Sequence, residues 1–182
     1  SSSSAARSDH LSNVWFSVTP LQVSHGQGCW VTTTDGEEYL DFAGGIAVNS
    51  TGHSHPAVVK AIADQAATLI HTSNLYQIPK QEQLGTKLAQ LAGMDKVFLC
   101  NSGAEANEAA IKLARLYGHN KGVDRPAIIV MEKSFHGRTL GALTATGQEK
   151  YRLGFEPLLP GVRNLPYGDI SALEQAMTER TA

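Results

Sequence analysis

The chain has 182 residues, 42% of them apolar, and a formal net charge of −2. This length and apolar content are enough for one domain of ordinary size with a buried core. The balanced charge, which includes no block of like residues, argues against a nucleic-acid partner and against an anionic membrane. No apolar run approaches the length of a membrane span, and Cys29 and Cys100 are too few for a disulfide framework. We therefore expect a soluble, cytoplasmic protein with reduced thiols.

The N-terminal part of the sequence predicts a tail followed by a small β segment. Residues 1–12 are rich in serine and have little apolar surface to bury, so we expect a flexible tail there. A serine-rich start that carries Arg7 also occurs at the end of organelle transit peptides, which leaves an organelle matrix open as a location. Within residues 13–55, strand-like runs flank Thr34-Asp35-Gly36, and Asp-Gly in that setting predicts a β-hairpin.

Two helices are expected next. The first runs from Pro56 to about Leu69, because proline suits the first helical turn and apolar residues recur at helical spacing. The second runs from about Gln81 to Leu91. His53 and His55 precede the first helix, but no further metal ligands stand at usable spacing. We therefore favour a role for both histidines in turn geometry and hydrogen bonding.

A strand–helix junction follows. The run Val97-Phe98-Leu99-Cys100 predicts a short buried strand, and the composition after Ser102 predicts a helix that reaches about Tyr117. Ser102 and Glu105 stand at the spacing of a capping box, while Gly103 has no side chain and leaves the first N–H groups open to an anion. The junction therefore predicts either a phosphate site or only a well-capped helix.

A second motif, Ser134-Phe135-His136-Gly137-Arg138-Thr139, follows the apolar run of residues 127–131, which predicts another strand. Ligands of open α/β sheets bind at the carboxyl ends of the strands, so we expect the two motifs to face one crevice. Phe135 offers a flat face for an aromatic ring, and Arg138 offers a planar fork for a carboxylate. A lone Phe or Arg is more often a core residue or a surface charge. Their adjacency behind a strand favours a site for a phosphorylated aromatic cofactor beside an acid substrate.

Beyond Thr139, glycines and prolines break the pattern, and we expect loops there until a final helix from about Ile170 to Met177. The alternation of helix and strand predicts an α/β fold. Residues 56–182 are expected to contribute a mostly parallel sheet with flanking helices, and residues 13–55 the small β segment.

The chain resembles the N-terminal part of a class III, ornithine-type, pyridoxal-phosphate aminotransferase, most closely of the acetylornithine group. The blocks that carry this resemblance are, in order, Asp41–Asn49, Gly52–Pro56, His71–Asn74, Asn101–Glu108 and Phe135–Thr139. The resemblance implies a fold-type I transferase, of which this chain would hold an incomplete large domain. It also implies pyridoxal 5′-phosphate (PLP) as the cofactor and a homodimer as the full-length enzyme.

The resemblance further implies roles for individual residues. Ser102, Gly103 and Ala104 would bind the cofactor phosphate, with the N–H groups of the last two as donors. Phe135 would lie against the pyridine ring. Arg138 would bind the α-carboxylate of the amino donor and of 2-oxoglutarate.

The reaction implied is transfer of an amino group from N-acetylornithine to 2-oxoglutarate, a step of arginine biosynthesis. A 4-aminobutyrate or an ornithine or succinylornithine aminotransferase stays open, as does a non-catalytic α/β binding module. Members of the family are more than twice as long as this chain, and the lysine that forms the Schiff base lies beyond residue 182. We therefore assign no catalytic residue within the chain and expect the isolated chain to have no transaminase activity.

Overall fold

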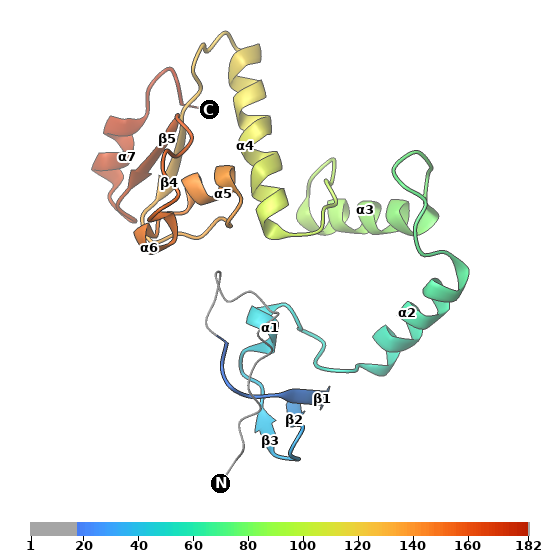
Figure 1. Ribbon diagram of the computed structural model, residues 1–182. Coiled ribbons are helices and arrows are strands. Elements are labelled where there is room, and N and C mark those ends of the chain that lie inside the picture. Colours follow the sequence, from blue (N-terminus) through green and yellow to red (C-terminus); the bar gives the residue numbers. More distant parts are fainter. Residues whose placement is uncertain (1–17, 182) are drawn as a thin grey trace. The chain divides into compact units, whose positions relative to one another are not determined.

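The computed structural model describes residues 18–181. The chain divides into two compact units, Ser1–Tyr76 and Gln77–Ala182, which are described separately below (Figure 1). The tail expected over residues 1–12 and the start of the segment expected over residues 13–55 lie outside the described residues. The domain boundary expected at residue 56 stays a prediction.

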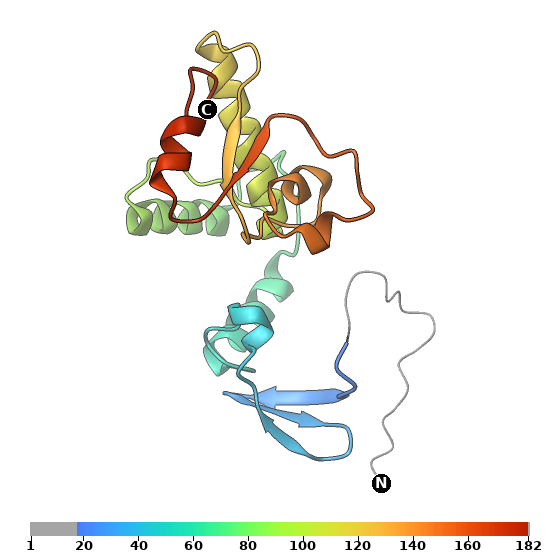
Figure 2. The ribbon, with the colours of Figure 1, turned by 90° about the vertical axis from the view of Figure 1, so that its left-hand side faces the viewer.

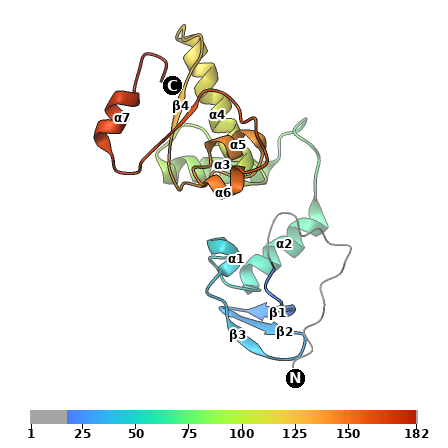
Figure 3. The ribbon, with the colours of Figure 1, turned by 60° about the vertical axis from the view of Figure 1, so that its left-hand side comes forward.

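The N-terminal unit contains a small antiparallel sheet. Its strands are β1 (Val23–Gln27), β2 (Trp30–Thr33) and β3 (Glu38–Leu40), in the order β1-β2-β3 (Figure 3). The hairpin predicted around Asp-Gly is confirmed: β2 and β3 pair antiparallel, and the Gly36 N–H donates to the Thr33 carbonyl at 3.1 Å. The sequence did not predict β1, because its residues are mostly polar and include a glycine, which is depleted in strands.

Three helices follow in chain order. The short α1 (Gly44–Ala47) contains residues with left-handed φ angles and is a local turn, whereas α2 (Pro56–Thr68) and α3 (Pro79–Ala92) are regular. Both regular helices begin at a proline, whose fixed φ and missing N–H suit the first turn. The two helices expected from the sequence are therefore confirmed, with boundaries that differ by one or two residues at most ends.

The C-terminal unit alternates helix and strand. After α3 its elements are α4 (Gly103–Asn120), β4 (Ile128–Met131), α5 (Leu140–Ala145), α6 (Glu149–Arg152), β5 (Val162–Leu165) and α7 (Ile170–Ala176). The strands β4 and β5 pair in parallel, with Ile128 opposite Val162. Helices α4 and α7 lie on opposite sides of this strand pair (Figures 1 and 3). This arrangement confirms the expected α/β class with parallel pairing.

Two local predictions are wrong. Residues 97–100 do not form a strand, since no described segment pairs with them, and a strand exists only through its ladder of hydrogen bonds. Phe98 in this run is 68% exposed. The segment beyond Thr139 is not all loop, because it contains α5, α6 and β5 (Figure 2). These elements are short, and β5 has two adjacent polar residues at its centre in place of an apolar–polar alternation, so their patterns were too weak to predict them.

The buried core of the described residues centres on α5. Every residue from Gly141 to Ala145 is buried, and Thr146 at the end of the helix is fully buried. The buried residues Ala127 and Val130 lie at β4 and immediately before it. Small residues allow this helix to sit close to its neighbours. The core therefore fixes the end of the segment that connects β4 to α5.

Candidate active site

The start of α4 presents free hydrogen-bond donors. Ser102 is the N-cap, and its Oγ accepts from the Glu105 N–H at 3.2 Å. The Glu105 carboxylate accepts from the Asn101 N–H at 2.6 Å, one residue earlier than in a standard capping box. The N–H groups of Gly103 and Ala104 have no acceptor within the helix, as at any helix start. A Cβ added at Gly103 would meet no atom within 4 Å, so the space beside these donors is open.

The segment Ser134–Thr139 packs directly on this helix start. Gly137 has a φ angle of 131°, and a Cβ added there would lie 2.8 Å from Ala104 Cβ. The backbone therefore approaches α4 at a distance that only glycine allows. On the other side, the His136 N–H donates to Thr146 Oγ1 at 3.0 Å. The fully buried Thr146 thus anchors the middle of the segment to the end of α5.

Two polar side chains from the second turn of α4 also hold this segment. Asn107 Nδ2 donates to the His136 carbonyl at 2.8 Å. The Glu108 carboxylate accepts from the Thr139 hydroxyl and from the Ala142 N–H, the latter at 3.0 Å. The Thr139 hydrogen bond is the main cause that lowers the pKa of Glu108, and bonds from backbone N–H groups of α5 add to it. The carboxylate is therefore ionised at neutral pH.

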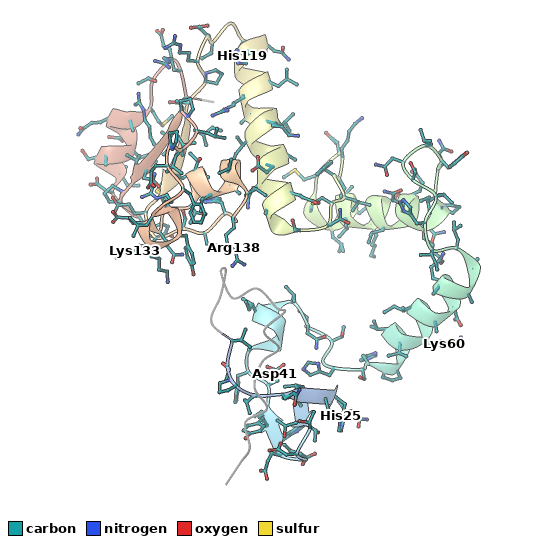
Figure 4. The ribbon with its side chains drawn as sticks, in the orientation of Figure 1. His25, Asp41, Lys60, His119, Lys133 and Arg138 are labelled. Atoms are coloured by element: carbon teal, nitrogen blue, oxygen red, sulfur yellow. The ribbon has the colours of Figure 1, made fainter. Side chains whose placement is uncertain are left out.

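These walls enclose a hollow of about 590 Å³. The residues that line it are Ser102, Gly103, Ala104, Asn107, Phe135, His136, Gly137, Arg138 and Thr139. All five residues that the sequence analysis assigned to binding are among them. Arg138 projects from the segment that leads into α5 (Figure 4). The structure brings the candidate residues together, while their ligand roles stay predictions.

The aromatic ring in the hollow has an aromatic neighbour. The rings of Phe135 and Tyr151 meet edge to face, with centroids 5.5 Å apart and planes at 68°. Lys150 Nζ lies 4.8 Å from the centre of the Tyr151 ring. Phe135 is 51% exposed, so part of its surface remains available for contact.

Sequence reasoning missed the contribution of Asn107 and Glu108 to the geometry of this site. Both were noted only as markers of a resemblance. Their partners lie 29 to 34 residues away along the chain, so no local pattern links them. One signal could have indicated this contribution: Asn107 and Glu108 form a polar pair in the second turn of the predicted helix, and the residues on either side of the pair are alanines.

His53, one of the two histidines that precede α2, belongs to a separate network in the N-terminal unit. His53 Nε2 lies 2.7 Å from Asp41 Oδ2, and Asn49 Nδ2 lies 3.1 Å from His53 Nδ1. The His53 hydrogen bond, followed by that of the Gly44 N–H, lowers the pKa of Asp41 (labelled in Figure 4). Among residues 18–181, no group of three or more His, Cys, Asp or Glu side chains could hold a metal ion. The hydrogen bonds to Asp41 and Asn49 give His53 the role expected of it, whereas the role expected of His55 stays a prediction.

Two further observations concern regions outside the hollow. The stretch His71–Asn74 belongs to the N-terminal unit, whereas every residue that lines the hollow belongs to the C-terminal unit. In the described part of the chain, no helix has both the length and the apolar character needed to span a membrane.

Comparison with known proteins identifies relatives over most of the chain. The acetylornithine aminotransferase of Nitrosomonas europaea is 54% identical over 166 residues, which is 91% of this chain and 42% of that protein. The solved N-acetylornithine aminotransferase of Stenotrophomonas maltophilia K279a is 35% identical with a TM-score of 0.74, and the match covers 89% of this chain and 40% of that one.

A third relative carries the cofactor. It is the ornithine aminotransferase of Toxoplasma gondii crystallised with oxidised glutathione, which has partial occupancy of PLP at its active site. It is 33% identical with a TM-score of 0.83, and the match covers 87% of this chain and 38% of that one. This chain thus spans about 40% of the length of the three relatives.

The family profile described as aminotransferase class-III matches residues 11–182. This match covers nearly the whole chain and agrees with the relatives and with the parallel α/β fold. The chain belongs to the class-III aminotransferase family.

Proposed function

We propose that this chain supplies the cofactor-phosphate and substrate-carboxylate end of a PLP-dependent transaminase that moves an amino group from N-acetylornithine to 2-oxoglutarate. The observation that carries the proposal is the single hollow lined by Gly103, Ala104, Phe135 and Arg138. The kinship to acetylornithine aminotransferases at 54% identity supports the choice of amino donor.

The residues present fit this cofactor. The hollow of about 590 Å³ has the size of small-molecule sites, which typically measure roughly 300–1,000 Å³. It combines donors for an anion at a helix start, a partly exposed aromatic face and a cation, which match a phosphate, an aromatic ring and a substrate carboxylate. The open space beside Gly103 leaves the donors accessible to a phosphate group.

Each side chain has a distinct task in this proposal. The N–H groups of Gly103 and Ala104 donate to phosphate oxygens, and the positive end of the α4 dipole favours the negative charge. Phe135 lies against the cofactor ring. Arg138 binds the substrate carboxylate with two parallel hydrogen bonds and so orients the donor and the keto acid. PLP, when bound, supplies the carbonyl carbon that takes up the amino group from the donor and passes it to the keto acid.

We assign no residue of this chain to proton transfer at the substrate carbon. The resemblance to the family implies that this step belongs to a lysine beyond the matched segment. The isolated chain is therefore expected to turn over no substrate. The homodimeric state of the full-length protein and its cytoplasmic location also remain predictions.

A chimera tests the proposal. In the Nitrosomonas europaea acetylornithine aminotransferase, the segment that aligns with this chain is replaced by the 166 aligned residues of this chain. We refer to this protein below as the chimera. We expect it to bind PLP and to form glutamate from 2-oxoglutarate with N-acetylornithine as donor, faster than with ornithine or 4-aminobutyrate. A preference for either of those donors would overturn the substrate assignment, and a soluble chimera that binds no PLP would overturn the site.

Arg138→Lys in the chimera tests the role of the guanidinium. A lysine keeps the charge but cannot copy the bidentate fork, so KM for 2-oxoglutarate should rise by roughly tenfold or more. Arg125→Lys is the matched control, because Arg125 is exposed and lies outside the hollow. Equal KM values for the two variants would remove Arg138 from the substrate site.

A further inference from the structure

The hollow has one regular wall and one irregular wall. The first turn of α4 is helical, but Ser134–Thr139, which carries Phe135 and Arg138, is neither helix nor strand. The position of these two side chains therefore depends on anchors outside their own segment.

Glu108 provides such an anchor next to Arg138. Thr139 is the N-cap of α5, yet its own side chain makes no capping hydrogen bond. Instead, the Glu108 carboxylate accepts from the N–H of Ala142, the third residue of α5, at 3.0 Å. That N–H is one that an N-cap side chain normally binds. The same carboxylate oxygen accepts from the Thr139 hydroxyl, so α4 supplies the cap that α5 lacks.

The backbone of α5 is shaped to receive this carboxylate. A Cβ added at Gly141 would lie only 2.6 Å from Glu108 Oε1, so the carboxylate rests against the helix backbone where no side chain intervenes. Asn107, the neighbouring residue of α4, holds the His136 carbonyl at 2.8 Å. Two adjacent residues of α4 thus form hydrogen bonds to the chain on both sides of Arg138, at His136 before it and at Thr139 after it.

We propose that Glu108 is a positioning residue, whose carboxylate fixes Thr139 and the start of α5 against α4 and thereby holds Arg138 where it binds the substrate carboxylate. The second half of this statement rests on the proposed function, in which Arg138 is the carboxylate ligand. The first half concerns only contacts within the chain. The two halves can therefore be tested separately.

The first test measures hydrogen–deuterium exchange of the 182-residue chain without cofactor. Glu108→Gln preserves side-chain size and one carbonyl oxygen, but it removes the charge and replaces the other oxygen with an NH2 group that cannot accept. We expect amides of residues 134–146 to exchange about tenfold faster, because charge-assisted hydrogen bonds become weaker neutral ones. Glu108→Asp keeps the charge and should restore part of the protection. Glu174→Gln, at an exposed position of α7, is the control and should leave exchange unchanged.

The second test measures kinetics of the chimera. Glu108→Gln should raise KM for 2-oxoglutarate by roughly five- to tenfold while PLP affinity changes less, because the α4 donors stay in place. In the Arg138→Lys background the same substitution should add little, since two residues that act through one contact are not additive.

The outcomes separate the two proposals. Unchanged exchange in Glu108→Gln overturns the anchoring role, whatever the chimera does. A second outcome is that Glu108→Gln speeds exchange but leaves KM for 2-oxoglutarate unchanged, while Arg138→Lys does raise that KM. Glu108 would then be structural only, and the positioning role would be overturned. A folded wild-type chimera that transfers no amino group refutes the proposed function instead, and the exchange result then stands by itself.

Discussion

Gly137→Ala is the most direct perturbation of the irregular wall. Gly137 has a φ angle of 131°, which residues with a side chain rarely adopt. An added Cβ would lie 2.8 Å from Ala104 Cβ and 3.0 Å from Ala142 Cβ. Neither neighbour is the flexible end of a long side chain, because both Cβ atoms are fixed to helix backbones. The new methyl group must therefore displace the segment itself.

Two terms determine the size of the effect. A non-glycine residue held in a rarely populated backbone region costs roughly 1–3 kcal/mol. Carbon atoms in contact lie about 3.5–4.0 Å apart, so the methyl group must retreat by about 1 Å, and such overpacking costs roughly 1–3 kcal/mol more. The free energy of unfolding of the C-terminal unit should fall by roughly 2–6 kcal/mol, against roughly 5–15 kcal/mol for a typical folded domain.

Gly154→Ala separates the two terms. Gly154 also has a positive φ, 84°, but a Cβ added there would meet no atom within 4 Å. This variant therefore carries only the backbone term, roughly 1–2 kcal/mol. Urea unfolding of the 182-residue chain, followed by far-ultraviolet circular dichroism, measures both variants against the parent chain.

PLP affinity of the chimera provides the second readout. Gly137→Ala moves the segment that bears Phe135 and Arg138. PLP affinity should therefore fall by about tenfold or more, because binding residues displaced by about 1 Å no longer match their ligand. Gly154→Ala should leave it unchanged. Equal destabilisation by the two substitutions, together with equal PLP affinity, would show that the segment does not rest on Ala104 and would refute the reasoning.

Two further perturbations address other parts of the chain. Thr146→Val should destabilise the chain by about 1–3 kcal/mol in urea unfolding, because it leaves the half-buried N–H of His136 without its acceptor. Thr146→Ser keeps the hydroxyl, and an equal loss in both variants would contradict this. The pKa of Asp41 lies below its ordinary value of about 3.9, since His53 and the Gly44 N–H bind the ionised form. The stability that this carboxylate contributes is present above its unfolded pKa and is lost as pH falls through its lower folded pKa. Asp41→Asn should therefore flatten the fall of the urea midpoint between about pH 5 and pH 2, and an unchanged pH profile would contradict the assignment.

Local patterns predicted the parts of the site that local structure forms. The unpaired N–H donors at Gly103 exist because a helix begins there. Ser102 and the composition of the following residues predict this helix start without tertiary information. Residues 127–131 were apolar enough to predict β4. The parallel class followed from the alternation of elements, although the strand predicted at residues 97–100 did not form. A hydrophobic run satisfies the side-chain requirement for a strand but not the requirement for a paired neighbour.

The sequence could not predict the contacts that shape the segment between β4 and α5. The base of this segment is closed by Gly147, whose N–H donates to the Ser134 carbonyl at 3.0 Å and whose carbonyl accepts from the Lys133 N–H at 3.0 Å. Each of these hydrogen bonds joins residues 13 or 14 positions apart, with α5 between them. Such pairing depends on the buried position of α5, which only the folded chain establishes.

Three protein contacts hold the segment that forms the irregular wall of the hollow. Gly147 closes the base of the segment, Thr146 holds its middle, and Glu108 holds the end that adjoins Arg138. These anchors come from α4 and from the end of α5, the most buried helix among the described residues. A binding group that is fixed before its ligand arrives loses less conformational entropy when the ligand binds. For this reason, substitutions at the anchors should weaken ligand binding even though Thr146 and Glu108 do not line the hollow.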